Sequence, residues 1–323
     1  MKEYERSGEL IQSYECLNAC LTNYLCLRGK RISPARVFFG GIGFDFKCCE
    51  KDGRQQLLSN MYKANFMYMD KVGIEYIHDF FTKTAEEMQF VVKEVVVKKN
   101  IIALKIQSDY LKYNRVYSQT IAMHYIDIID YNEERQEFYI IDGDVPTAIP
   151  SAFSGWVNAN ELIEGWKKTN CEYVAFIDCE NINIFSDKEM IFFVGKQLIE
   201  YCNSESNVKG VLAVSTYFKN LEVEDEEQLS KTARETNYQI KVEGIWASRY
   251  YLLEFIISLD LDEEYIEKLK EIIKQWNALC MSLIKLSISK RERDKEMTLS
   301  MLSNILSKEK EYFNNLNAYL MNK

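Results

Sequence analysis

Hydrophobic and polar positions follow two different periods along this chain. Over residues 15–28 the apolar side chains recur every three or four positions, which predicts a helix. Ser13 is the predicted N-cap of this helix, and Gly29 is the predicted stop at its C-terminus. Pro34 suits the first position of a second, short helix. A third helical pattern covers residues 70–89.

After residue 90 the pattern changes to short runs that are rich in β-branched and aromatic residues, which predict strands. The predicted strands are 90–92, 95–97, 101–106, 123–131, 137–142 and 172–177. The turn at 132–135 joins two of them into a hairpin, whose second strand ends at Asp142. Residues 160–168 are predicted to be helical.

Beyond residue 185 the helical period dominates, and no proline interrupts it. Helices are predicted at 189–201, 226–237 and 245–259, followed by two long antiparallel helices within 262–317 that break near 288–293. The fold class is therefore predicted to be α+β. A first domain is expected at 1–180, and a mainly helical second domain at 181–323.

Composition excludes several classes of protein. Hydrophobic residues make up 47% of the 323 positions and charged residues 28%, which predicts a packed core rather than disorder. The net charge of −9 argues against general nucleic-acid binding, because that function needs a basic surface. We find no apolar run of membrane-spanning length and no signal-peptide pattern, so a cytoplasmic protein is expected. Its nine cysteines are expected to be reduced thiols.

Two residues indicate a reactive site. Cys16 lies at the predicted start of the first helix, where the positive end of the helix dipole favours a thiolate. His124, one of only two histidines, opens a predicted strand about a hundred residues later. A histidine brought beside the thiol by folding can hold the two groups as thiolate and imidazolium. This combination predicts acyl chemistry through a covalent thioester.

Short motifs extend this hypothesis. Gly29 follows Cys16 by thirteen residues, and residues 39–44 then read Phe-Gly-Gly-Ile-Gly-Phe. Later, His124-Tyr125-Ile126 opens one strand, and Ile140-Ile141-Asp142-Gly143 closes the next. With these motifs, residues 10–180 resemble the N-terminal domain of the butirosin biosynthesis protein H family, and the helical tail shows a weaker similarity. That family belongs to the papain-like group that includes the double-glycine leader peptidases.

The resemblance implies a papain-like domain, in which an N-terminal helix packs on an antiparallel sheet. It also implies an acyltransferase of antibiotic biosynthesis that moves an acyl group from an acyl carrier protein to an amine. By this resemblance Cys16 is the nucleophile, His124 the base and then the acid, and Asp142 the group that orients the imidazole. Gln12 is a candidate helper of the oxyanion hole, although it stands only four residues before the cysteine.

Each candidate has a competing interpretation. Cys20 and the pair Cys48-Cys49 are interpreted as structural, and His78 as a surface or packing residue of a helix. Asp144, Asp127 and Asp130 compete with Asp142, which is preferred because it ends the strand.

Other motifs also have two interpretations. The glycines Gly40, Gly41 and Gly43 lack the lysine of a P-loop, so they are interpreted as a tight turn that lines the substrate cleft. The basic run 290–293 is interpreted as a solvated turn or helix face, with contact to an acidic carrier protein as the alternative. No cysteine and histidine spacing indicates a zinc site, so neither a metal nor a cofactor is expected.

Three functions remain open. The leading hypothesis is a cysteine-dependent acyltransferase whose partners are an acyl carrier protein, or another thioester donor, and an amine acceptor that is a small molecule or a peptide. The second hypothesis is a papain-like peptidase or thioesterase that uses the same residues. The third is a non-catalytic interaction protein on a papain-like scaffold. The sequence leaves the oligomeric state open, including a homo-oligomer.

Overall fold

The computed structural model describes residues 11–38, 41–48, 55–83, 86–114, 121–143, 152–177, 182–206, 209–223, 225–241 and 244–322. The chain separates into two compact units, which are named here unit 1 and unit 2. Unit 1 comprises Met1–Val37 and Asn65–Ile184, and unit 2 comprises Phe38–Ala64 and Phe185–Lys323.

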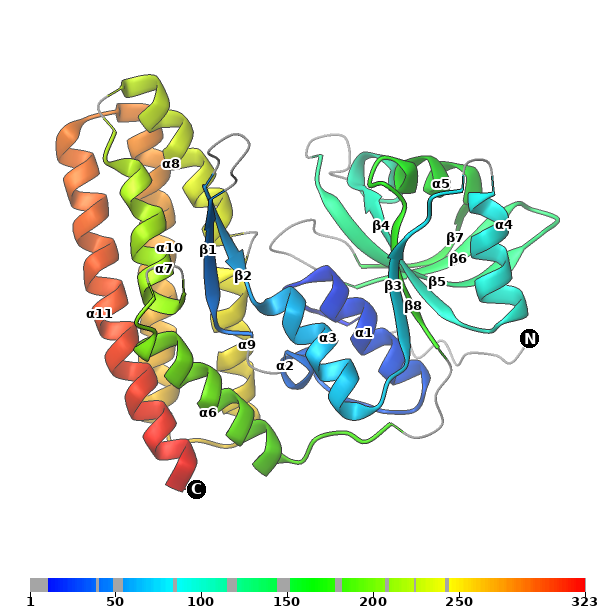
Figure 1. Cartoon of the computed structure of the whole chain (residues 1–323), viewed down its shortest axis with the longest axis horizontal. Coiled ribbons are helices and arrows are strands. Elements are labelled where there is room, and N and C mark those ends of the chain that lie inside the picture. Colours follow the sequence, from blue (N-terminus) through cyan, green and yellow to red (C-terminus); the bar gives the residue numbers. More distant parts are fainter. Residues whose placement is uncertain are drawn as a thin grey trace. The chain divides into compact units, whose positions relative to one another are not determined.

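Unit 1 is built on a six-stranded antiparallel sheet (Figure 1). Its strands, in spatial order, are β3 (Tyr76–Phe80), β8 (Glu172–Phe176), β4 (Ile101–Gln107), β5 (Met123–Asn132), β6 (Glu137–Asp142) and β7 (Phe153–Asn158). The hairpin predicted at 123–142 is the β5–β6 pair, with Asp142 at its end.

The other elements of unit 1 are helical. They are α1 (Cys16–Leu27), α2 (Pro34–Val37), most of α3 (Met61–Val72), α4 (Glu87–Val92), the π-helix η1 (Lys93–Val97), the 3₁₀-helix η2 (Ser108–Tyr110) and α5 (Ala159–Lys167). The predicted N-terminal helix, the short helix that begins at Pro34 and the helix at 160–168 are thereby confirmed.

Helices cover both faces of this sheet. Ile126 of β5 lies in the hydrophobic core that includes Trp166 of α5. Its neighbour Asp127 instead meets Asn23 of α1, whose side-chain amide donates to the Asp127 carboxylate at 3.1 Å. Because neighbouring residues of a strand point to opposite faces, α1 packs on the face of the sheet opposite α5. The N-terminal helix is thus placed against the strands that carry His124 and Asp142.

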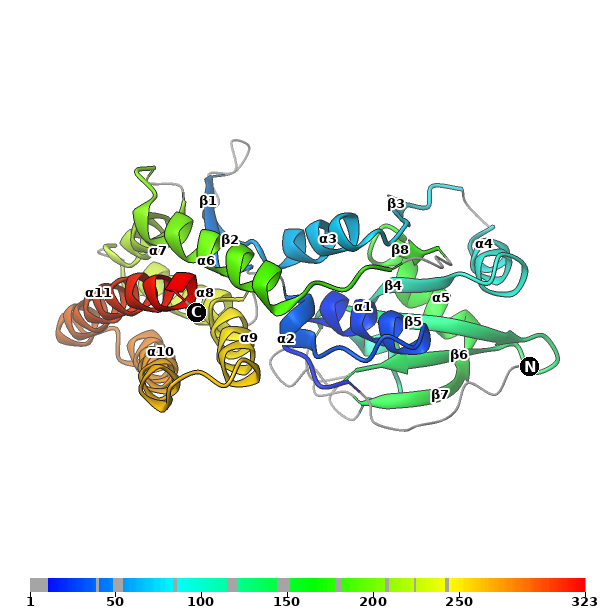
Figure 2. The same cartoon turned by 90° about the horizontal axis from the view of Figure 1, so that it is seen from below.

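Unit 2 combines a small hairpin with a helical bundle. Strands β1 (Phe44–Cys48) and β2 (Gln55–Ser59) pair antiparallel. The helices are α6 (Asp187–Asn203), α7 (Gly210–Phe218), η3 (Lys219–Leu221), α8 (Glu226–Lys241), α9 (Ile245–Ser258), α10 (Glu263–Ser289) and α11 (Glu292–Asn322). The long helices α10 and α11 lie side by side (Figure 2). Lys290, at φ 54°, makes the break between them that was predicted near 288–293.

The α+β class is confirmed, but several predicted elements are wrong. The helix predicted at 70–89 divides into the end of α3, strand β3 and the start of α4, so His78 lies on a strand. The strands predicted at 90–92 and 95–97 belong to α4 and η1. Val91 and Val95, four residues apart, are both buried in the core of unit 1. Both side chains reach the core only when the segment is helical. The packing of this core therefore outweighs the preference of valine for strands.

Some elements were not predicted at all. Strand β7, helix α7 and the β1–β2 hairpin have no counterpart among the predictions. The structure also assigns residues 38–64 to unit 2, whereas the predicted domain boundary at residue 180 left them with the first domain. Phe44 of this segment packs against Tyr201 of α6, with ring centroids 6.5 Å apart. Within the described ranges, no helix combines the length and apolar character that a membrane span needs.

Candidate active site

Cys16 is the first residue of α1, and both ends of this helix are closed by specific hydrogen bonds. At the C-terminus, the amide of Gly29 donates to Cys26 O and the amide of Lys30 donates to Leu25 O, both at 2.9 Å. This arrangement is a Schellman motif, which requires the left-handed φ of 75° that Gly29 adopts. The predicted role of Gly29 is confirmed.

At the N-terminus the cap is Glu15, not the predicted Ser13. The Glu15 carboxylate accepts from the amides of Leu17 at 2.9 Å and Asn18 at 2.7 Å. Ser13 instead donates its hydroxyl to Asn18 Oδ1 at 2.9 Å. Since Glu15 occupies these amides, they are not turned toward the sulfur of Cys16. The amide of Cys16 itself lies outside this cap.

His124 and Asp142 are joined directly. His124 Nε2 lies 2.8 Å from Asp142 Oδ1, and both side chains are only 1% exposed. The other carboxylate oxygen accepts the hydroxyl of Tyr113 at 2.8 Å. Tyr113 in turn stacks on Phe153, with ring centroids 4.3 Å apart. The carboxylate is therefore fixed from two sides and can hold the imidazole in one orientation.

The end of β6 is pressed against the first helix. A Cβ atom at Gly143 would lie 2.7 Å from the carbonyl oxygen of Ile11 and 2.9 Å from Ala19 Cβ in α1. Only glycine fits this approach. Because Gly143 has no side chain, the end of β6 can lie close to the beginning of α1, where Cys16 is located.

The electrostatics of His124 link it to both partners. Burial alone would lower the pKa of His124, but the charge and hydrogen bond of Asp142 outweigh burial and raise this pKa to about 10, with a smaller upward contribution from Cys16. Since Nε2 is bonded to Asp142, Nδ1 is the ring nitrogen that remains for an interaction with Cys16. Nδ1 is buried and makes no standard hydrogen bond within the described part of the chain. The geometry suits an imidazolium beside a reactive sulfur.

Cys16 differs from the other cysteine near the site in its access to solvent. Cys16 is partly exposed, whereas Cys20, one helical turn further on, is 2% exposed. Burial, followed by the charge of Asp127, raises the pKa of the Cys20 thiol well above its ordinary value. Burial likewise raises the pKa of Asp127. Cys20 and Asp127 are therefore both buried in the interior, and of the two cysteines Cys16 is the one that is open to solvent.

The other predicted residues lie in different surroundings. Gln12 is exposed at the start of the described chain. Gly41 and Gly43 belong to unit 2, where a Cβ atom would meet Met61 Cα at 2.8 Å and Asn60 Nδ2 at 2.5 Å, respectively. Gly40, Cys49 and Asp144 lie outside the described residues. His78 lies 3.2 Å from Glu172, away from the Cys16 group.

Three polar residues of the site were not recognised from the sequence. Glu15 was overlooked because Ser13 is the commoner type of N-cap. Tyr113 and Asn65 carry no local signal, since the fold alone brings them to Asp142 and Glu15. Among the described residues, no three histidine, cysteine or acidic side chains are grouped as metal ligands.

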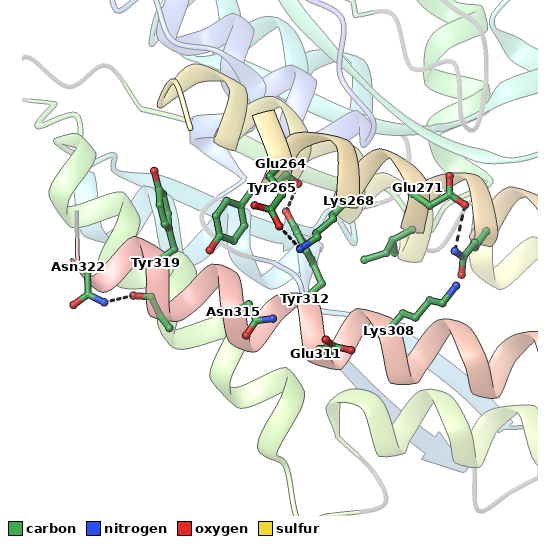
Figure 3. Close-up of a pocket in the computed structure, with 13 residues that line it drawn as sticks. Glu264, Tyr265, Lys268, Glu271, Lys308, Glu311, Tyr312, Asn315, Tyr319 and Asn322 are labelled. Atoms are coloured by element: carbon green, nitrogen blue, oxygen red, sulfur yellow. Dashed lines mark hydrogen bonds and ion pairs between the residues drawn. The ribbon is translucent and has the colours of Figure 1, made fainter. Parts of the chain in front are cut away.

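Unit 2 holds a separate groove of about 660 Å³ between α10 and α11 (Figure 3). Tyr265, Tyr312 and Tyr319 line part of it, and Lys268 pairs with Glu264 at 2.6 Å. Its mixed charges favour no single class of ligand, and it shares no residue with the Cys16 group.

No protein-family model matches this chain, and no curated protein matches it either.

Proposed function

We propose that this protein is a cysteine-dependent acyltransferase on a papain-like scaffold. It takes an acyl group from a thioester, such as that of an acyl carrier protein, and transfers it to an amine in antibiotic or other secondary-metabolite biosynthesis. Cys16 is the nucleophile, His124 the proton carrier and Asp142 the residue that orients and charges His124. The carrier, the acceptor and the pathway class come from the motif resemblance alone.

One observation carries this proposal: the buried 2.8 Å His124–Asp142 pair interacts with a partly exposed cysteine at a helix start. Burying a histidine and a carboxylate is costly unless they are paired. The pair here uses only Nε2 of the ring, and Nδ1 has no hydrogen-bond partner among the described residues. A purely structural pair gains nothing from an unsatisfied nitrogen, whereas a nucleophilic site needs one.

In the first half-reaction the sulfur of Cys16 attacks the carbonyl carbon of the donor thioester. A new carbon–sulfur bond forms, and the bond to the donor sulfur breaks. The imidazolium of His124 gives its proton to the departing thiolate, so the donor leaves as a thiol. The oxyanion is stabilised by the Cys16 amide, with Gln12 as a proposed helper.

In the second half-reaction a neutral amine attacks the acyl-enzyme. A carbon–nitrogen bond forms, the bond to Cys16 breaks, and His124 accepts the proton that the nitrogen loses. Asp142 stabilises the imidazolium that results. The site is then restored to its starting state.

Product analysis tests this proposal and separates it from hydrolysis. The protein is incubated with the butyryl thioester of N-acetylcysteamine and a panel of primary amines, and amide and free acid are quantified by mass spectrometry. Amide in excess of acid supports a transferase. Acid alone at every amine concentration overturns transfer and identifies a thioesterase, and no turnover with a panel of acyl chains argues against an enzyme of this class.

A further inference from the structure

Glu15 makes one contact that helix capping does not require. Besides its bonds to the backbone, its Oε1 lies 3.6 Å from the sulfur of Cys16, which is close enough for a protonated thiol to donate a hydrogen bond to it. A carboxylate beside a nucleophilic sulfur brings two negative charges together, and these charges repel. Its presence therefore needs another explanation.

A buried polar network holds this carboxylate in place. Asn65 donates to Glu15 Oε2 at 2.7 Å, and its own Oδ1 lies 3.3 Å from Asn18 Nδ2. Asn18 is also bonded to Ser13. These three supporting residues are 5% exposed or less. Such a shell pre-organises Glu15 at the sulfur rather than leaving it as a mobile surface residue.

Acylation changes what Glu15 faces. Three of its four acceptor positions meet the amides of Leu17 and Asn18 and the side chain of Asn65. The fourth, on Oε1, faces the sulfur of Cys16, which the proposed mechanism uses as a thiolate. An acylated sulfur has neither a proton nor a charge. One acceptor position on Oε1 is then left beside the thioester, on a negatively charged group.

We propose that Glu15 recognises the acceptor, and that the acceptor is an amine that arrives as an ammonium cation. The ammonium donates to Glu15 Oε1, which brings its nitrogen next to the thioester carbon. This inference rests on the proposed function, because it assigns the acceptor to the same site.

The protons balance with the groups present. An ammonium ion has two protons to lose before it becomes an amide. The first passes to bulk water from the ion held at Glu15, which generates the neutral nucleophile. The second passes to His124 as the carbon–nitrogen bond forms and the bond to Cys16 breaks. Glu15 is unchanged at the end of the cycle.

The test compares a cationic with a neutral nucleophile on preformed acyl-enzyme. Wild type and Glu15→Gln are loaded with butyryl-N-acetylcysteamine, freed of donor, and chased at pH 7.5 with ethanolamine, which is cationic, or hydroxylamine, which is neutral. Loss of the butyryl group is followed by intact-mass spectrometry. Glu15→Gln is expected to slow the ethanolamine chase by about tenfold to a hundredfold, as for a lost charge-assisted hydrogen bond. The hydroxylamine chase is expected to change by less than about threefold.

The controls separate this inference from the proposed function and from misfolding. Glu189→Gln, which removes another helix-capping carboxylate, is expected to behave as wild type. Glu15→Asp, which keeps the charge, is expected to retain part of the preference for ethanolamine. In wild type, added salt should slow the ethanolamine chase more than the hydroxylamine chase, and this measurement needs no variant.

An equal slowing of both nucleophiles in Glu15→Gln, or no selective salt effect in wild type, overturns the role of Glu15. Acyl-enzyme formation in the same samples shows that the proposed function survives. If wild type does not load the acyl group, the proposed function itself fails.

Discussion

A buried ion pair lies in each unit, and these two pairs are built differently. In unit 2, Arg249 contacts Glu309 through two bonds of 2.8 and 2.7 Å, and Glu309 also accepts from Tyr201 and Trp276. The guanidinium further donates to Ser248 and to the carbonyl of Ile42. In unit 1, the His124–Asp142 pair leaves Nδ1 of the ring without a standard bond within the described residues.

We interpret the pair in unit 2 as structural and the pair in unit 1 as part of the proposed catalytic site. Arg249 is also surrounded by the rings of Phe44, Tyr201 and Phe313 at 4.9 to 5.5 Å, so its whole surface is occupied. A fully hydrogen-bonded pair of this kind helps to specify a single packing of the core of unit 2. It leaves no hydrogen-bonding position for a substrate. The pair in unit 1 tolerates an unsatisfied nitrogen beside a cysteine, as a nucleophilic site requires.

The largest effect is expected when the pair of unit 1 is broken. Replacing His124 by Gln removes the proton carrier, so formation of the acyl-enzyme should slow by about a thousandfold. The rate is measured by intact-mass spectrometry with butyryl-N-acetylcysteamine. His78→Gln changes the only other histidine, which contacts Glu172 instead, and should load at the wild-type rate. Equal rates for both variants and wild type would remove His124 from the mechanism.

Breaking the Arg249–Glu309 pair of unit 2 should lower the stability of the fold rather than the rate of acylation. Arg249→Met leaves Glu309 buried without its counter-ion, which costs about 3–5 kcal/mol in the free energy of unfolding. Chemical denaturation measures this loss. Lys268→Met breaks an exposed pair with Glu264 and should leave the stability unchanged. A stable Arg249→Met protein would show that the saturated network is not needed for folding.

The free energy of unfolding should depend on pH through the His124–Asp142 pair of unit 1. Because folding raises the pKa of His124 to about 10 from about 6.5, the folded state binds a proton that the unfolded state lacks between these values. The stabilisation is therefore complete below pH 6.5 and is lost progressively as the pH rises to about 10. Its slope is at most about 1.4 kcal/mol per pH unit. Denaturation of wild type and His124→Gln across this range should give curves that converge toward pH 10, and parallel curves would contradict the raised pKa.

A smaller effect is expected from Tyr113→Phe. The variant keeps the stacking on Phe153 and removes only the hydroxyl that donates to Asp142. Because this bond is made to a buried carboxylate, its loss should slow acylation by about fivefold or more and lower the free energy of unfolding by about 1–3 kcal/mol. Tyr139→Phe removes a hydroxyl that contacts Ser154 instead, so it should match wild type. The same rate in both variants would mean that Asp142 is held without Tyr113.

The sequence predicted the parts of the site that depend on local pattern. The helix that begins at Cys16 and the hairpin that ends at Asp142 have clear periods and turn residues, and both are present. The supporting residues depend on tertiary contacts that have no local signature. Asn65, for example, reaches Glu15 across fifty positions of sequence.

The prediction of secondary structure failed where packing outweighs propensity. The valine-rich residues 90–97 are helical because Phe90 packs against Trp166, with ring centroids 6.2 Å apart, and Val91 and Val95 join the same core. Residues 38–64 belong to unit 2 for a similar reason, since the packing of Phe44 could not be read from its neighbours in sequence. Periodicity therefore located elements well only where burial and propensity agree.

The central claim is that Cys16 carries the acyl group, and intact-mass spectrometry after incubation with butyryl-N-acetylcysteamine tests it most directly. Cys26, which is also partly exposed and lies on the same helix, provides the control. Wild type and Cys26→Ala are expected to gain the mass of one butyryl group, and Cys16→Ala none. Equal labelling of Cys16→Ala, or a folded wild-type protein that remains unlabelled with every acyl chain offered, would contradict the account.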